Sequence, residues 1–130
     1  MAAEPIVYCL TRDHELAAAI DQRLHGAIAF FFNDAGRLEQ AVVLRAPNVV
    51  LVDTGAVRAE YGDAGLGPIF EEVRRRAPSA RLAVRPMPGV EHLVAAEAGP
   101  DVEITASDLD ACADRTAEVC ARAVRADRAN

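Results

Sequence analysis

Short apolar runs and longer stretches of helical periodicity alternate along the whole chain. Five apolar runs are typical of strands buried on both faces, and they lie at residues 6–10, 27–32, 49–52, 81–84 and 102–105. Between them apolar residues recur at helical spacing, beginning with Leu16, Ala17, Ile20 and Leu24. No linker or internal repeat interrupts the alternation. The pattern predicts a doubly wound α/β domain.

Polar and turn residues indicate where the helices begin and end. Asp13 fits the N-cap of the first helix, and Pro68 suits the first position of a helix that follows the third strand. Ser107 and Asp110 fit a capping box that opens the last helix. The polar tail, residues 125–130, is expected to be frayed or to begin a linker.

Five strand–helix units of this length favour the flavodoxin-like fold, a five-stranded parallel sheet in the order 2-1-3-4-5. The 130 residues, of which 52% are hydrophobic, suit one domain spanning residues 1–130. In this order the first and third strands flank the crevice where the strand order reverses. Ligands bind at the carboxyl ends of the strands in such a sheet, so this crevice is the expected site.

Charge and hydropathy exclude several classes of function. The net charge of -6 argues against nucleic-acid binding, which needs a clustered basic face. No stretch approaches the roughly 20 apolar residues of a membrane span, and the N-terminus lacks the pattern of a signal peptide. The three cysteines form no metal-ligand or redox motif, so they are interpreted as reduced structural residues. Together these features predict a soluble cytoplasmic protein.

A carboxylate, Asp53, ends the third apolar run, and Thr11, Arg12 and Asp13 follow the first. Because the first and third strands are neighbours in the expected order, Thr11, Arg12 and Asp53 should meet in the crevice. Two interpretations of Arg12 stay open. Its guanidinium can pair bidentately with Asp53, or the side chain can face solvent from a loop.

Four features together resemble the receiver domain of bacterial response regulators, over essentially the full chain. They are the number of strand–helix units, the strand that ends in Asp53, the segment Asp34-Ala35-Gly36 and the helix start Asp13-His14-Glu15-Leu16. The resemblance implies a CheY-like fold and a role in two-component signalling or a phosphorelay. In that family the Asp that ends the third strand is phosphorylated, and Asp53 occupies its position.

Other positions depart from the family pattern. The paired acids that hold Mg²⁺ in the family align with Thr11 and Arg12, its switch Ser or Thr aligns near Pro86, and its Lys aligns near Ala106. Phosphoryl transfer to a carboxylate builds up negative charge that a metal ion must neutralise. Asp53 is therefore expected to be a poor phosphoacceptor, and no metal or other cofactor is expected.

Three hypotheses for function follow. The first is a degenerate pseudo-receiver that acts by protein–protein interaction in signalling or regulation, without enzymatic activity. The alternative is a working receiver phosphorylated at Asp53, with Mg²⁺ held by Asp13 or by backbone carbonyls. The third is a small-ligand or flavin binder on the same fold; it is the weakest because no Gly-rich phosphate cradle follows the first strand.

Three further segments carry expectations about packing and partners. The long loop expected from Ala56 to Gly67 carries Arg58, Glu60 and Tyr61, and it is interpreted either as a partner contact or as a mobile connection. The run Phe30-Phe31-Phe32 is expected to be mostly core. The last helix has an apolar face that serves either core packing or a homodimer contact.

Overall fold

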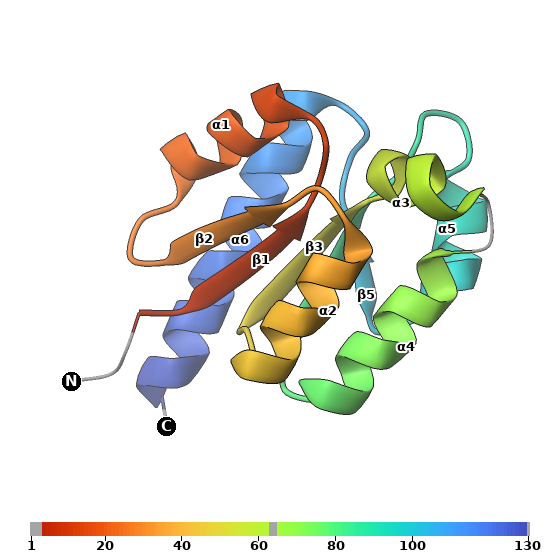
Figure 1. Cartoon of the computed structure of the whole chain (residues 1–130). Helices are drawn as coiled ribbons and strands as arrows, with labels where there is room; N and C mark the ends of the chain where they lie inside the picture. The colour runs from red at the N-terminus through yellow and green to blue at the C-terminus, as the bar shows by residue number, and fades with distance from the viewer. Residues whose placement is uncertain (1–3, 63–64, 130) are drawn as a thin grey trace.

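A computed structural model describes residues 4–62 and 65–129, and within them five strands and six helices alternate, except that two helices follow the third strand (Figure 1). The strands are β1 (Ile6–Leu10), β2 (Ile28–Phe32), β3 (Val49–Asp53), β4 (Arg81–Arg85) and β5 (Val102–Ile104). The helices are α1 (His14–Arg23), α2 (Ala35–Leu44), α3 (Thr54–Tyr61), α4 (Leu66–Arg76), α5 (Glu91–Ala98) and α6 (Leu109–Ala129).

All neighbouring strands pair in parallel, in the order β2-β1-β3-β4-β5. This is the predicted flavodoxin-like order, and it is confirmed. The central strands β1 and β3 are buried along their whole length, as their continuous apolar runs predict. The topology places the ends of β1 and β3 side by side at the switch point.

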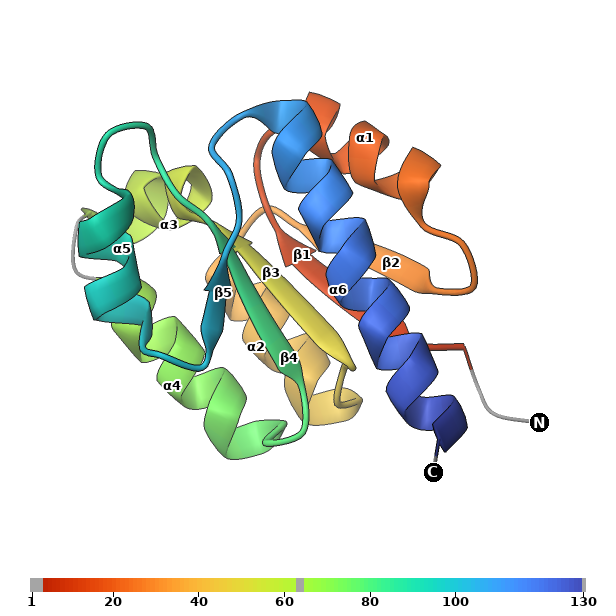
Figure 2. The same cartoon turned by 180° about the vertical axis from the view of Figure 1, so that it is seen from behind.

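Helices cover both faces of the sheet (Figures 1 and 2). On one face α1 and α6 pack over Val7, Cys9 and Leu51 of the central strands. On the other face α2, α3, α4 and α5 pack over Tyr8, Val50 and their neighbours, and Phe70 of α4 is the largest fully buried side chain there. The alternation of side chains along each strand therefore produces two separate cores.

The predicted strand boundaries agree with the structure to within one residue, whereas three of the expectations about helix boundaries need correction. Asp108, rather than Ser107, caps α6, because its side chain accepts from the backbone N–H of Ala111 at 3.0 Å. Pro68 is the third residue of α4, where a missing N–H is also tolerated because the first four N–H groups lack helical partners. α6 continues to Ala129, through most of the tail that was expected to fray.

The apolar run of β2 is not the core strand that was expected. β2 lies at the edge of the sheet, and Ile28, Phe30 and Phe31 are 45%, 47% and 36% exposed. Phe32 is half-buried, and its ring meets that of Tyr8 edge to face with centroids 5.3 Å apart. The expectation was wrong because it assumed that both faces of every strand are covered by helices.

Candidate functional site

The carboxyl ends of three neighbouring strands converge on one crevice of about 380 Å³. Asp53 ends β3, Arg85 ends β4, and Asp13 follows β1 at the start of α1. Asp53 and Arg85 are register partners across the β3–β4 pair. Pro86, Met87, Pro88 and Ser107 complete the wall of this crevice. The crevice lies where the fold predicts a ligand or catalytic site.

Asp53 is buried, with 8% of its surface exposed, and both of its carboxylate oxygens are engaged. Oδ2 accepts a hydrogen bond of 2.8 Å from the hydroxyl of Thr11 and lies 3.5 Å from Nη1 of Arg85. Oδ1 accepts from the backbone N–H of Gly55 at 3.3 Å, which caps α3. Asp53 therefore holds together the ends of β1, β3 and β4 and the first turn of α3.

Arg85 is the central cation of the crevice, and its side chain is 15% exposed. Its Nη1 lies 2.9 Å from Oδ2 of Asp13 and reaches Asp53, while its Nε donates to the carbonyl of Ser107 at 3.0 Å. Burial lowers the pKa of Arg85, but the hydrogen bond to Asp13 and the charge of Asp53 outweigh it and raise the pKa overall. The guanidinium is therefore a permanent positive charge between two carboxylates.

Arg12 does not form the ion pair with Asp53 that was one of its two interpretations. Its side chain is exposed, and its Nε donates to the backbone carbonyl of Asn33 at 3.0 Å. Arg12 lines the rim of the crevice, and Arg85 takes the place beside Asp53 that was considered for it. Thr11 does reach Asp53, as the strand order predicted.

Asp13 has two roles, one on each carboxylate oxygen. Oδ1 accepts from the backbone N–H groups of Glu15 and Leu16 at 3.0 and 3.2 Å, which confirms the predicted N-cap of α1. Oδ2 pairs with Arg85. The hydrogen bond from Arg85 is the main cause that lowers the pKa of Asp13 below its usual value, and burial opposes it. Asp13 thus links the start of α1 to β4.

Asp13→Asn is expected to reduce the loss of folding stability that the protein shows as the pH falls below neutral. The lowered pKa of Asp13 in the folded state stabilises the fold above the unfolded pKa, and this contribution is lost as the pH falls through the folded pKa. Asn keeps the cap but loses the charge, so the variant should be less stable at neutral pH by on the order of 1 kcal/mol, discounted because Asp13 is partly exposed. The difference in stability between the variant and the wild type should vanish at pH values well below about 4.

Urea unfolding of both proteins at a series of pH values measures this effect. Asp21→Asn, an exposed change on the same helix, is the matched control and should leave the profile unchanged. If the variant differs from the wild type in free energy of unfolding by the same amount at every pH, the result would contradict the role of the Asp13–Arg85 pair.

The segment expected to be a long loop forms helix α3. Asp53 caps its start, Ala56 and Val57 are buried, and Gly62, with a φ of 72°, ends it. The helix was missed because two turns with glycine and few apolar residues give a weak periodic signal. Residues 63–64 of the expected loop lie outside the described residues.

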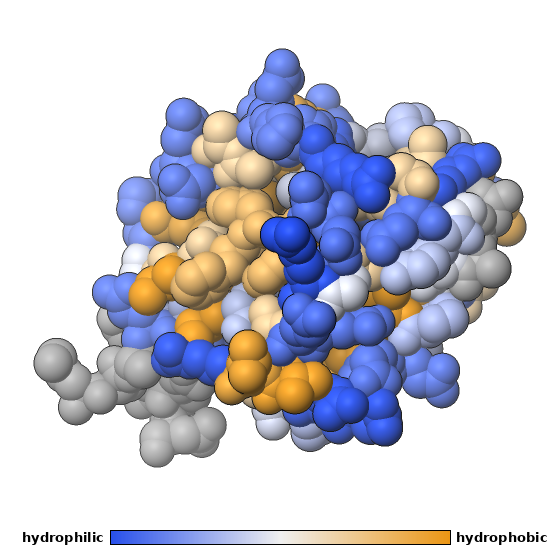
Figure 3. Space-filling view, viewed as in Figure 1, coloured by the Kyte–Doolittle hydropathy of each residue, from blue (hydrophilic) through white to orange (hydrophobic). Residues whose placement is uncertain are grey.

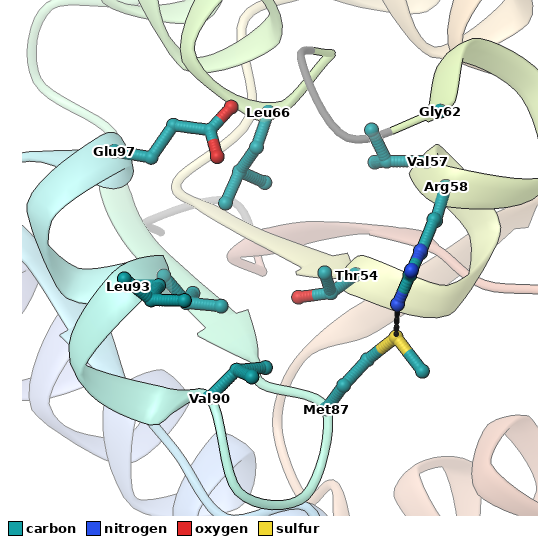
Figure 4. Close-up of a pocket in the computed structure, with 10 residues that line it drawn as sticks. Thr54, Val57, Arg58, Gly62, Leu66, Met87, Val90, Leu93 and Glu97 are labelled. Carbon is teal, nitrogen blue, oxygen red and sulfur yellow. Dashed lines mark hydrogen bonds between the residues drawn. The ribbon is translucent and has the colours of Figure 1, made fainter.

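The three residues considered as a partner contact lie on α3, in different environments. Tyr61 is 51% exposed. Glu60 Oε2 accepts from the backbone N–H of Ala35 at 3.0 Å and so ties α3 to the start of α2. Arg58 is exposed, and its Nη1 lies 3.5 Å from the sulfur of Met87 (Figure 4). Tyr61 and Arg58 are therefore exposed on the surface of α3, whereas Glu60 is engaged with the start of α2.

A second cavity of about 320 Å³ lies between α3, α5 and the start of α4 (Figure 4). Its wall is mainly apolar, with polar atoms from a few residues at its margin. It is lined by Thr54, Val57, Arg58, Gly62, Leu66, Met87, Val90, Leu93, Val94 and Glu97. Leu93 is 58% exposed at its mouth. A cavity of this kind suits an apolar group more than a phosphate.

The apolar face of α6 is used within the chain. Cys112, Val119 and Cys120 are buried against α1 and the sheet. These buried residues fit the core-packing interpretation of the helix. The cysteines are free and buried, and burial raises the pKa of Cys120 to about 12. The thiols are therefore structural, as expected.

Arg85 is the functional residue that the sequence interpretation missed, although a signal was present. The apolar run 81–84 predicts a strand that ends one residue before Arg85, and the family's switch hydroxyl aligns near Pro86. In the order 2-1-3-4-5, strands three and four are neighbours, so the residue that ends the fourth strand must lie beside the one that ends the third. In the structure β4 includes Arg85, which therefore lies opposite Asp53.

The fold and the site define the class of this protein only as a flavodoxin-like α/β domain with an ion-pair cluster at its switch point. Comparison with protein-family models finds no match, and a search of curated proteins finds no relative. Within the described part of the chain, no helix is long and apolar enough to cross a membrane.

Proposed function

We propose that this chain is a receiver-like signalling domain that acts by protein–protein interaction, without phosphorylation of Asp53. The observation that carries the proposal is the position of Arg85, whose guanidinium lies between the carboxylates of Asp13 and Asp53. The strand order and the place of Asp53 at the end of β3 support the resemblance to receivers.

A fixed cation beside Asp53 works against phosphoryl transfer in two ways. It occupies space next to the carboxylate that an incoming phosphoryl group and its metal ion would need. It also pairs with Asp13, the carboxylate considered as a metal ligand under the alternative of a working receiver. Phosphoryl transfer depends on positioning and on charge neutralisation by the metal, so an Asp already paired with Arg85 and Thr11 is a poor acceptor.

The surface of α3 and α5 is where we propose that a protein partner binds. The cavity there can take one apolar side chain, and the exposed Tyr61 and Leu93 lie on these two helices. Exposed aromatic and aliphatic side chains beside a preformed cavity are typical of the energetic centre of an interface. Asp53 caps α3, so the state of the crevice is linked directly to this surface.

Intact-protein mass spectrometry after incubation with Mg²⁺ and a small acyl-phosphate donor tests the proposal. We expect no gain of a phosphoryl group on the wild-type chain, with Asp53→Ala as the control for modification elsewhere. A gain that disappears in Asp53→Ala would contradict the proposal and would favour the working receiver. For the interaction itself, Leu93→Asp should weaken capture of a partner that the wild-type chain retains, whereas an exposed change on another face, Asp21→Asn, should not.

A further inference from the structure

One edge of the sheet is left unprotected. β2 is five residues long and pairs with β1 at all five positions without a bulge. It carries no charged residue and no proline, the two devices that usually discourage pairing at an edge. The opposite edge strand, β5, is only three residues long and carries Glu103 at its centre. The two edges therefore differ in the feature that prevents association between chains.

The exposed part of β2 is apolar on both faces of the strand. Ile28 and Phe30 lie on the α2 side together with Tyr8, and Phe31 lies on the opposite side. Figure 3 shows a band of apolar colour over β2, between α1 and α2. Tyr8 lies between this strand and the end of α2, because its hydroxyl donates to the carbonyls of Ala41 and Arg45.

The backbone of β2 also offers hydrogen bonds at this edge. The N–H of Ile28 donates to Pro5 and the carbonyl of Phe32 accepts from Thr11, so these two residues point their backbone groups toward β1. Because the direction alternates along a strand, the N–H and C=O groups of Ala29 and Phe31 point outward. An antiparallel strand centred on Phe30 would meet both residues as hydrogen-bonded pairs.

We infer that β2 is a dimer interface, in which the β2 strands of two copies of this chain pair antiparallel about a two-fold axis at Phe30. In this register Ala29 lies opposite the partner's Phe31, so a small side chain meets a large one. Phe30 lies opposite its own copy, and Ile28 lies opposite the partner's Phe32. The strand is thus complementary to itself, as a two-fold interface requires.

The apolar area on β2 suits a weak dimer. The three exposed side chains of β2 leave on the order of 250 Å² of apolar surface, taking about 200 Å² for a whole large side chain. A standard interface buries about 800 Å² per partner. The interface proposed here is smaller than this, so the stability of the dimer depends on the backbone hydrogen bonds of Ala29 and Phe31 as well as on apolar contact. Pairing would join the two sheets into one continuous sheet.

Sedimentation equilibrium from low micromolar to high micromolar concentration tests this inference. The wild-type chain should dimerise. Phe30→Lys places two ammonium groups opposite each other and should raise the dissociation constant by on the order of 100-fold. Ala29→Pro removes an outward N–H without touching the β1 ladder, and it should also weaken the dimer. Leu93→Lys is the matched control on α5 and should leave the dimer intact.

Amide hydrogen exchange by NMR gives a second measurement that needs no variant. The N–H groups of Ala29 and Phe31 should exchange more slowly as the wild-type concentration rises. A wild-type chain that stays monomeric, unchanged exchange at these two amides, or a dimer equally sensitive to Leu93→Lys would overturn the inference. Circular dichroism identifies any variant that fails to fold. The inference does not depend on the proposed function, because the phosphorylation experiment tests the chemistry of the crevice, whereas sedimentation and hydrogen exchange test pairing at the edge strand.

Discussion

Arg85→Ala is expected to lower the free energy of unfolding by about 3 kcal/mol at neutral pH, because removing one partner of a buried ion pair leaves the other charge uncompensated. Asp53 is 8% exposed and would keep only Thr11 and a backbone N–H as donors. Asp13 would lose its cation as well. Urea unfolding at neutral pH measures the change.

The loss of stability caused by Arg85→Ala should become smaller in acid. A loss caused only by missing packing contacts would not depend on pH in this way. Without Arg85, the negative charges of Asp13 and Asp53 face the same crevice with no cation between them, and this repulsion disfavours the folded state. The resulting destabilisation is present at neutral pH and is relieved as the pH falls and one of the two carboxylates binds a proton. A loss from Arg85→Ala that is the same at every pH would contradict this account.

Two further variants make the comparison specific. Arg81→Ala, at the exposed start of the same strand, is the matched control and should change stability by less than about 0.5 kcal/mol. In the double variant Arg85→Ala/Asp53→Asn, much of the loss should be recovered, because the uncompensated charge is removed along with its partner. Equal losses of stability from Arg85→Ala and Arg81→Ala would show that the ion pairs of the crevice contribute little to the free energy of unfolding.

Phe70→Ala is expected to lower the free energy of unfolding by about 4 kcal/mol, the usual cost of removing a buried aromatic side chain and leaving a cavity. Phe70 is completely buried on α4, in the core that joins α2, α4 and α5 to the sheet. The same core supports the cavity between α3 and α5, so the apolar lining there should loosen too.

Phe31→Ala provides a matched control with the same change in side chain. Phe31 is 36% exposed on β2, so its removal should cost far less than that of Phe70. Both variants are compared by urea unfolding at low micromolar concentration, where a dimer through β2 would dissociate. Similar losses for the two variants would mean that the core around Phe70 is not the main support of this face.

Local sequence signals determined the five strands and the start of the first helix, and the succession of strands and helices predicted the order of the sheet. The buried runs that end at Leu10 and Asp53 predicted two central strands, and Asp13 predicted the first N-cap. These signals are readable because burial on both faces and capping depend on residues that are close in sequence. The meeting of Thr11 with Asp53 followed from the strand order alone.

Three features were decided only by the tertiary structure. Arg85, rather than Arg12, pairs with Asp53, because the neighbour of β3 at that end is set by sheet order and by the last residue of β4. α3 forms although its residues show little helical periodicity, because Asp53 and Glu60 tie it to surrounding elements. The aromatic run of β2 is exposed because helices do not cover both faces of this strand at the edge of the sheet. Each depends on which elements become neighbours in space, and a local pattern of apolar and polar residues does not contain that information.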